Sequence, residues 1–136
     1  MKILILSPVF PWPLYSGDRI RIFHAIRQLS THFDVTLLSL TNKPKHLVDL
    51  GPLPSFCKQI KTVSLASDPR RAALNSFFTC RPYRVARFWD ERFQDLCHNL
   101  LEKEAYDYIF INFLNMMAYL PSSHPSVIID QHNADE

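Results

Sequence analysis

Short apolar runs alternate along the chain with segments whose apolar residues recur at helical spacing. Ile3 to Leu6 is a continuous apolar run, which is typical of a strand buried on both faces of a parallel sheet. A proline-rich loop over Ser7 to Gly17 follows, and Asp18 stands where a helix N-cap is expected. An apolar stripe then predicts an amphipathic helix, with Arg21, Gln28 and His32 off the stripe: Ile22, Ile26, Leu29 and Phe33.

The same alternation continues to the end of the chain. Val35 to Leu40 is a second buried strand, and further strands are predicted over residues 59–65, 108–112 and 127–130. Helical spacing is found over residues 69–78, 89–100 and 114–120. The sequence therefore predicts an α/β, three-layer Rossmann-like domain, with about five parallel strands in the order 3-2-1-4-5 and four or five helices.

Length and composition fit one such domain over residues 1–136. The last predicted strand is followed by only six residues and no helix to cover it, so we expect a truncated domain. The formal net charge of +2 and the absence of a like-charge block argue against nucleic acid as a partner. The sequence has no Gly-x-Gly-x-x-Gly and no Walker loop, which leaves nicotinamide, flavin and nucleotide hydrolysis unsupported.

Three widely spaced cysteines, Cys57, Cys80 and Cys97, form no Cys-x-x-Cys pair. This spacing predicts neither a zinc site nor a disulfide framework, and favours buried, reduced thiols in a cytoplasmic protein. The apolar run near Met1 is too short for a signal peptide, and no run approaches the length of a membrane span. Any membrane contact is therefore expected to be peripheral, at the inner face.

Basic and aromatic residues are interleaved over residues 69–89. One interpretation is a surface that docks on anionic lipid or on a lipid diphosphate, where arginines meet phosphate and aromatic rings lie at the headgroup level. The other, which we favour, is a pair of helices with core aromatics and a solvated arginine face. The residues concerned are Arg70, Arg71, Arg81, Arg84 and Arg87 with Phe77, Phe78, Tyr83, Phe88 and Trp89.

Two segments at opposite ends of the chain resemble one known family. The first is the strand, loop and helix over residues 1–40, whose loop reads Pro-Val-Phe-Pro-Trp-Pro-Leu-Tyr-Ser-Gly-Asp-Arg-Ile-Arg. The second, Ile-Ile-Asp-Gln-His-Asn-Ala-Asp-Glu, is similar to a strand-ending Asp-x-His-Asn-x-Glu motif. Both resemble the GT-B glycosyltransferases of group 1, or family four, especially the bacterial branch that acts in polysaccharide export.

The resemblance implies roles for individual residues. Gly17 matches the glycine that lets backbone amides approach the donor diphosphate, and a residue without a side chain at a helix N-terminus suits that role. His132 matches the catalytic histidine that faces the donor sugar, and Asn133 is its substrate-binding neighbour.

Two departures from the family pattern concern acidic residues. Many members have a second glycine where this chain has Asp18, so we place Asp18 with the acceptor or with helix capping. The motif ends Ala-Asp-Glu where Val-Glu is common, so its acidic role stays unassigned. Arg19 and Arg21 are either acceptor-binding or solvated charges of the helix face.

The resemblance implies the acceptor-binding N-terminal half of a retaining hexosyltransferase, with a nucleotide sugar as co-substrate, a glycan or lipid-linked acceptor and no essential metal. The C-terminal nucleotide-sugar domain is absent from this sequence, so the chain alone is expected to be inactive. Two other classes stay open. One is a non-catalytic recruiting subunit of a split glycosyltransferase, for which a homodimer is plausible. The other is a small nucleotide-binding domain unrelated to sugars.

Overall fold

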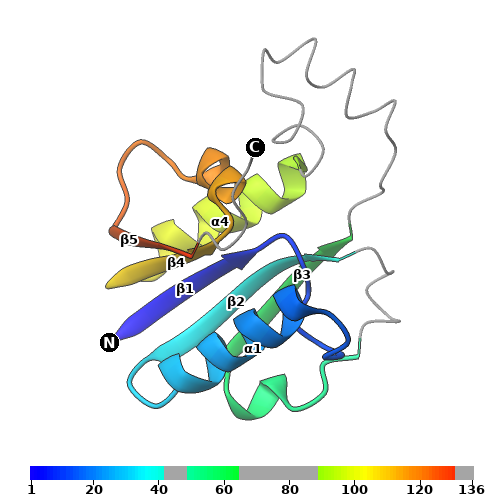
Figure 1. Cartoon of the computed structure of the whole chain (residues 1–136). Helices are drawn as coiled ribbons and strands as arrows, with labels where there is room; N and C mark the ends of the chain where they lie inside the picture. The colour runs from blue at the N-terminus through cyan, green and yellow to red at the C-terminus, as the bar shows by residue number, and fades with distance from the viewer. Residues whose placement is uncertain (42–48, 65–88, 131–136) are drawn as a thin grey trace, which may run out of the picture.

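The computed structural model describes residues 1–41, 49–64 and 89–130, which form a five-stranded parallel sheet with helices on both faces (Figure 1). The strands are β1 (Lys2–Ser7), β2 (Asp34–Thr41), β3 (Gln59–Ser64), β4 (Tyr108–Asn112) and β5 (Ser126–Asp130). The described helices are α1 (Gly17–Leu29) and α4 (Glu91–Lys103), with two short 3-10 helices, η2 (Leu53–Ser55) and η3 (Leu114–Tyr119).

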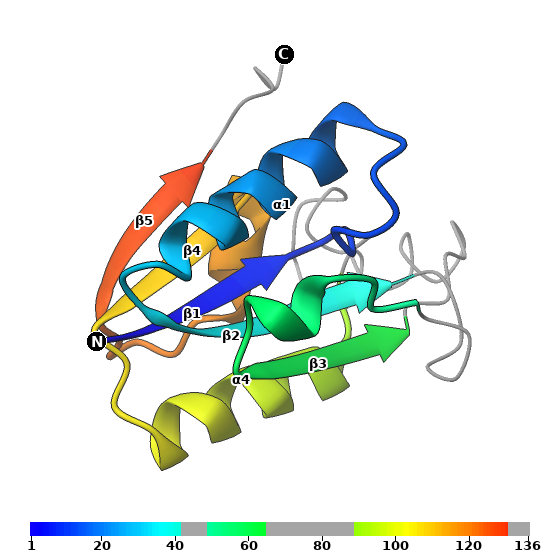
Figure 2. The ribbon, with the colours of Figure 1, turned by 90° about the horizontal axis from the view of Figure 1, so that it is seen from below.

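The strand order is β3-β2-β1-β4-β5, as the sequence predicts, and every pairing is parallel. All the strands therefore run towards one edge of the sheet, as the arrows of β1, β3 and β5 show (Figure 2). The chain builds outwards from β1 to β3 and then returns to the other side of β1 for β4 and β5. The carboxyl ends of β1 and β4 consequently flank the topological switch point, where open α/β sheets bind their ligands.

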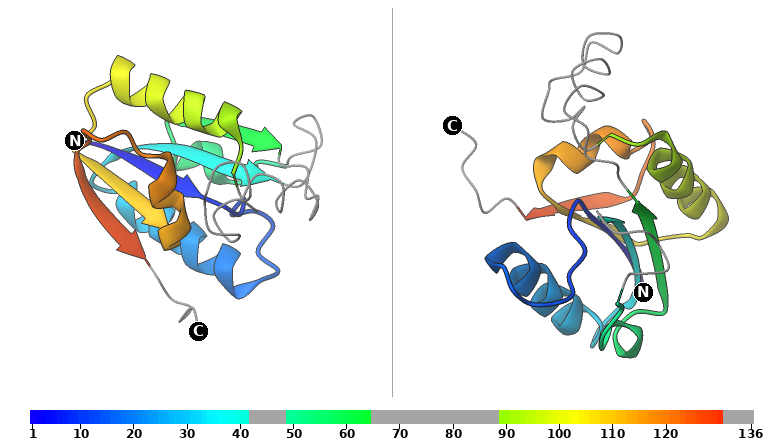
Figure 3. Two further views of the ribbon diagram at one scale, coloured as in Figure 1. Left: turned by 90° about the horizontal axis from the view of Figure 1, so that it is seen from above. Right: turned by 90° about the vertical axis from the view of Figure 1, so that its right-hand side faces the viewer.

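Helices cover both faces of the sheet (Figure 3), and a layer of apolar side chains holds them against each face. Since side chains alternate along a strand, consecutive residues of β1 enter opposite layers. On one face α1 and η2 pack over Ile3, Ile5, Val35, Leu37, Ile22, Phe23, Ile26 and Leu53. On the other face α4 and η3 pack over Leu4, Leu6, Leu38, Leu40, Phe93, Cys97, Leu100, Met116 and Tyr119. The domain is thus a three-layer α/β, Rossmann-like arrangement.

A buried carboxylate begins α4. Asp90 is the N-cap of α4, and its Oδ1 accepts a hydrogen bond from the Arg92 amide at 2.8 Å. The Arg92 guanidinium returns to Asp90 at 2.8 Å and also donates to the Ser64 carbonyl at 2.7 Å. The Asp90 amide donates to the Tyr119 hydroxyl, whose ring stacks on Trp89 at 4.6 Å. These contacts fix the start of α4 against the end of β3 and against η3.

The five predicted strands are confirmed, and each of their ends lies within one residue of the predicted position. The helical segments predicted over residues 89–100 and 114–120 correspond to α4 and to the 3-10 helix η3. The helical stripe is also confirmed, since Ile22 and Ile26 are buried and Leu29 and Phe33 pack against the same cluster. The predicted helix over residues 69–78 lies outside the described residues, as does the whole basic and aromatic segment before Trp89.

The N-cap prediction is wrong. Ser16, not Asp18, caps α1: its backbone is extended and its Oγ accepts from the Arg19 amide at 3.5 Å. Since α1 begins at Gly17, the residue before it is the cap, and Asp18 lies inside the first turn. There its carboxylate is stabilised by the positive end of the helix dipole.

The cysteine prediction is confirmed for two residues. Cys57 and Cys97 are free and buried, and burial raises the pKa of each thiol to about 12. Cys80 lies outside the described residues. Of the described helices, none has the length and apolar character needed to cross a membrane.

Candidate functional site

A row of polar side chains crosses four neighbouring strands at the carboxyl edge of the sheet. Ser39 pairs with Ser7 in the register of β2 and β1, and Asn112 pairs with Asp130 in the register of β4 and β5. Asn112 Nδ2 donates to Ser7 Oγ at 3.3 Å and so joins the two pairs. Two residues earlier on the same face, the corresponding row is apolar: Leu37, Ile5, Phe110 and Ile128. The polar row therefore marks the end of the core on the α1 face.

The hydrogen bonds of this row leave one acceptor unused. Ser7 Oγ donates to the Val9 carbonyl at 2.7 Å and accepts from the Val9 amide at 3.3 Å. Asn112 is fully buried, and within the described part of the chain its Oδ1 has no hydrogen-bond partner. Such an atom costs about 1–3 kcal/mol and is uncommon in folded proteins. It lies beside the switch point, where a ligand would be expected.

The turn after β4 is strained. Phe113 has a φ of 75°, a left-handed value that a side chain with a Cβ rarely adopts. Its amide donates to the Asp130 carbonyl at 3.1 Å and holds this turn beside the end of β5. Asn115, two residues further on, also has a buried Oδ1 for which the described residues supply no partner. Strain and unsatisfied polar atoms of this kind occur together at functional sites.

The amino end of α1 opens onto the same edge of the sheet. Gly17, the first residue of α1, is exposed, and a Cβ added to it would meet no atom within 4 Å. The first amides of a helix have no partner within the helix and carry the positive end of its dipole. The space beside the Gly17 Cα is therefore open, and the positive end of the helix dipole favours an anion there.

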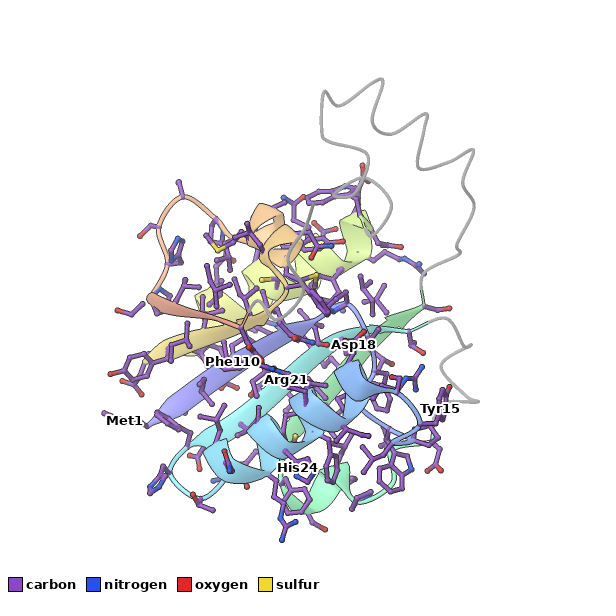
Figure 4. All side chains as sticks on the ribbon, in the orientation of Figure 1. Met1, Tyr15, Asp18, Arg21, His24 and Phe110 are labelled. Carbon is purple, nitrogen blue, oxygen red and sulfur yellow. The ribbon has the colours of Figure 1, made fainter. Side chains whose placement is uncertain are left out.

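The two arginines of this region both contact protein groups. Arg19 donates to the Trp12 carbonyl at 3.2 Å and lies over the Tyr15 ring at 4.5 Å, which ties the proline-rich loop to α1. Arg21 binds Asp130 through both carboxylate oxygens, at 3.0 and 2.8 Å. In Figure 4, Asp18 and Arg21 lie on the side of α1 that faces β4 and β5.

The Arg21–Asp130 pair connects α1 to the last residue of β5, across 109 positions of sequence. The hydrogen bond to Asp130 raises the pKa of the Arg21 guanidinium above its ordinary value. The side chain of Asp130 is largely covered, whereas about half of the Arg21 side chain is exposed. Arg21 is thus a bridge between the two parts of the site as well as a surface charge.

The structure brings together four of the six predicted site residues, Gly17, Asp18, Arg19 and Arg21, on the first two turns of α1. His132 and Asn133 lie outside the described residues. The sequence interpretation missed Ser7, Asn112 and the pairing of Asp130. A usable signal was present, because each of these residues is the polar end of an apolar run.

Other features of the described chain carry less chemistry. A hollow of about 450 Å³ lies at the opposite, amino edge of the sheet. Its charges neutralise one another, since Lys2 pairs with Glu104 at 3.6 Å and Lys58 with Asp34 at 3.1 Å. No group of three or more histidine, cysteine or acidic side chains in residues 1–41, 49–64 and 89–130 is placed to hold a metal ion.

Comparisons with known proteins bear on the fold. No family model matches the chain, and no curated protein matches it. Among solved structures, the C-terminal domain of a hydrogenase from Pyrococcus furiosus superposes with a TM-score of 0.56 and 16% identity. The match covers 96% of this chain and 91% of that domain. At this identity the likeness supports the α/β fold and carries no information on activity.

Proposed function

We propose that the chain is the acceptor-side domain of a retaining GT-B glycosyltransferase, and that it contacts the diphosphate of a nucleotide-sugar donor at the amino end of α1. The observation that carries the proposal is the exposed Gly17 backbone at the start of α1, the helix that follows β1 at the carboxyl edge of the sheet. The resemblance of residues 1–40 and 127–136 to that family supplies the reaction class.

In this proposal the charge that develops on the departing diphosphate is stabilised by the first amides of α1, a term that is often large in such chemistry. Arg21 and Asp130 hold the end of β5 against α1. His132, the residue that the resemblance assigns to the donor sugar, follows Asp130 by two positions.

The test is an NMR titration of the ¹⁵N-labelled 136-residue chain with inorganic pyrophosphate. We expect the amide signals of Gly17, Asp18 and Arg19 to shift together, with a dissociation constant on the order of 1 mM because one helix end supplies few contacts. Gly17→Val should weaken the binding, since a branched side chain would fill the open space beside the Gly17 backbone. Gln28→Val, on the last turn of α1, is the matched control. Shifts that spare Gly17, or no shift at all, would contradict the proposal.

A transfer assay addresses the enzyme itself. We expect no sugar transfer by the purified chain from a panel of nucleotide sugars, because the proposed donor domain is not in this sequence. Sugar transfer by the chain alone would contradict the proposal that a separate domain binds the nucleotide-sugar donor.

A recruiting subunit is the second candidate, favoured by a specific observation. Ile128 and Ile129, on opposite faces of the edge strand β5, are 42% and 43% exposed. An edge strand presents unpaired backbone groups to a partner strand, and exposed apolar side chains beside it extend the contact. Sedimentation of the chain at increasing concentration, compared with Ile128→Lys, distinguishes self-association through this strand from a monomer.

A further inference from the structure

The unused acceptor on Asn112 is fixed by its surroundings. The single Ser7 hydroxyl hydrogen is donated to the Val9 carbonyl, so Ser7 Oγ can only accept from Asn112. Rotating the carboxamide by a half turn would place Oδ1 against Ser7 Oγ, whose hydrogen is already donated to the Val9 carbonyl. It would also leave the buried Nδ2 without an acceptor. The orientation with Oδ1 unpaired is therefore the better of the two.

The position of this acceptor relates it to the anion-binding end of α1. Asn112 lies between Ser7 of β1 and Asp130 of β5 in the polar row, on the face of the sheet that α1 covers. Asp130 is joined to α1 by Arg21, so the row and the helix belong to one site.

We infer that Asn112 Oδ1 accepts a hydrogen bond from a hydroxyl group of a phosphorylated sugar whose phosphate lies at the amino end of α1, an inference that rests on the proposed function. The chemical reason is that a carboxamide oxygen only accepts, and the oxygens of an ionised phosphate also only accept. Asn112 therefore discriminates in favour of the hydroxyl-bearing part of the ligand, and a phosphate without hydroxyls gains nothing from it.

Contact requires a local movement, because Oδ1 has no exposed surface. The strained turn at Phe113 is the place where this movement costs least, since a return to negative φ releases backbone strain. Binding should therefore shift the side-chain amide signals of Asn112 and the backbone amide signal of Phe113 together.

The experiment compares glucose 1-phosphate with methyl phosphate, which has the same phosphate monoester and no hydroxyl groups. In the ¹⁵N-labelled 136-residue chain, both should shift the Gly17 amide, and only the sugar phosphate should shift the Asn112 side-chain signals. Asn112→Leu should lower the affinity for glucose 1-phosphate about tenfold, because one hydrogen bond to a buried group is lost. The same substitution should leave the affinity for methyl phosphate unchanged.

Asn99→Leu is the matched control, because Asn99 is an exposed asparagine of α4, on the face of the sheet opposite α1. Equal shifts of the Asn112 side chain with both ligands, or an affinity of Asn112→Leu for glucose 1-phosphate as high as that of the unsubstituted chain, would overturn the inference while the proposed function stands. Failure of pyrophosphate to reach Gly17 would overturn both. The measurement on the unsubstituted chain decides the matter even if Asn112→Leu does not fold.

Discussion

The two glycines of the chain predict opposite effects of the same substitution. Gly17 has a backbone that is not left-handed, and a Cβ would project into open space at the first position of α1. Alanine there restricts the unfolded chain without creating a clash, so Gly17→Ala should raise the free energy of unfolding by about 0.4–1 kcal/mol.

Gly51 differs in both respects. Its φ of +53° is left-handed, which costs a residue with a Cβ about 1–2 kcal/mol. The added Cβ would also overlap the indole ring of Trp12, which packs against the core cluster under α1. Displacing that ring adds to the backbone term. The free energy of unfolding of Gly51→Ala should therefore be lower than that of Gly17→Ala by roughly 1.4–3 kcal/mol or more.

Urea unfolding followed by far-ultraviolet circular dichroism measures both variants without depending on the fluorescence of Trp12, which one substitution displaces. Equal slopes with separated midpoints are expected, because neither change alters the surface exposed on unfolding by much. A lower midpoint for Gly17→Ala, or equal midpoints for Gly17→Ala and Gly51→Ala, would refute the reasoning. The first outcome would mean that Gly17 is needed for the conformation of the helix start.

Three further predictions concern other parts of the described chain. Asp90→Ala removes a buried N-cap and should lower the free energy of unfolding by about 0.5–2 kcal/mol in urea, with Asp90→Asn, which keeps the cap, losing less. Burial raises the pKa of Cys57 and Cys97 from 9.0 to about 12, so the unfolded chain loses these protons first; their contribution to stability should be complete below pH 9.0 and disappear towards about pH 12. In the variant Cys80→Ser, an aromatic disulfide reagent should label Cys57 and Cys97 only after unfolding. Arg21→Gln and Asp130→Asn should lower the urea midpoint by similar amounts, and the double variant no further; additive losses would mean that the pair does not act as a unit.

Much of the fold could be predicted because its signals are local. Each strand of the sheet centre is a run of apolar residues, and such a run needs cover on both faces. Helical spacing between the runs and the right-handed crossover then limit the strand order to few choices. The start of α1 was misplaced, because serine and aspartate both favour the N-cap. Only the backbone conformation of Ser16 distinguishes it from Asp18.

The site was less predictable because its contacts are not local. Asn112 meets Ser7 across 105 positions of sequence, and this contact exists only in one register of β1 against β4. A shift of one residue would turn Asn112 to the opposite face, away from α1. No property of either residue alone specifies that register, which is set by the apolar residues on both faces of the sheet.

The polar row also separates the functional classes that the sequence leaves open. A recruiting subunit needs an exposed edge such as that of β5 with Ile128 and Ile129, and gains nothing from a buried carboxamide oxygen that has no partner among the described residues. A nucleotide-binding domain unrelated to sugars needs the amides at Gly17, and its affinity should not depend on hydroxyl groups beyond the phosphate. A domain that handles phosphorylated sugars uses both features at once. The combined response of Gly17 and Asn112 to one ligand therefore discriminates among the three classes more sharply than either residue does alone.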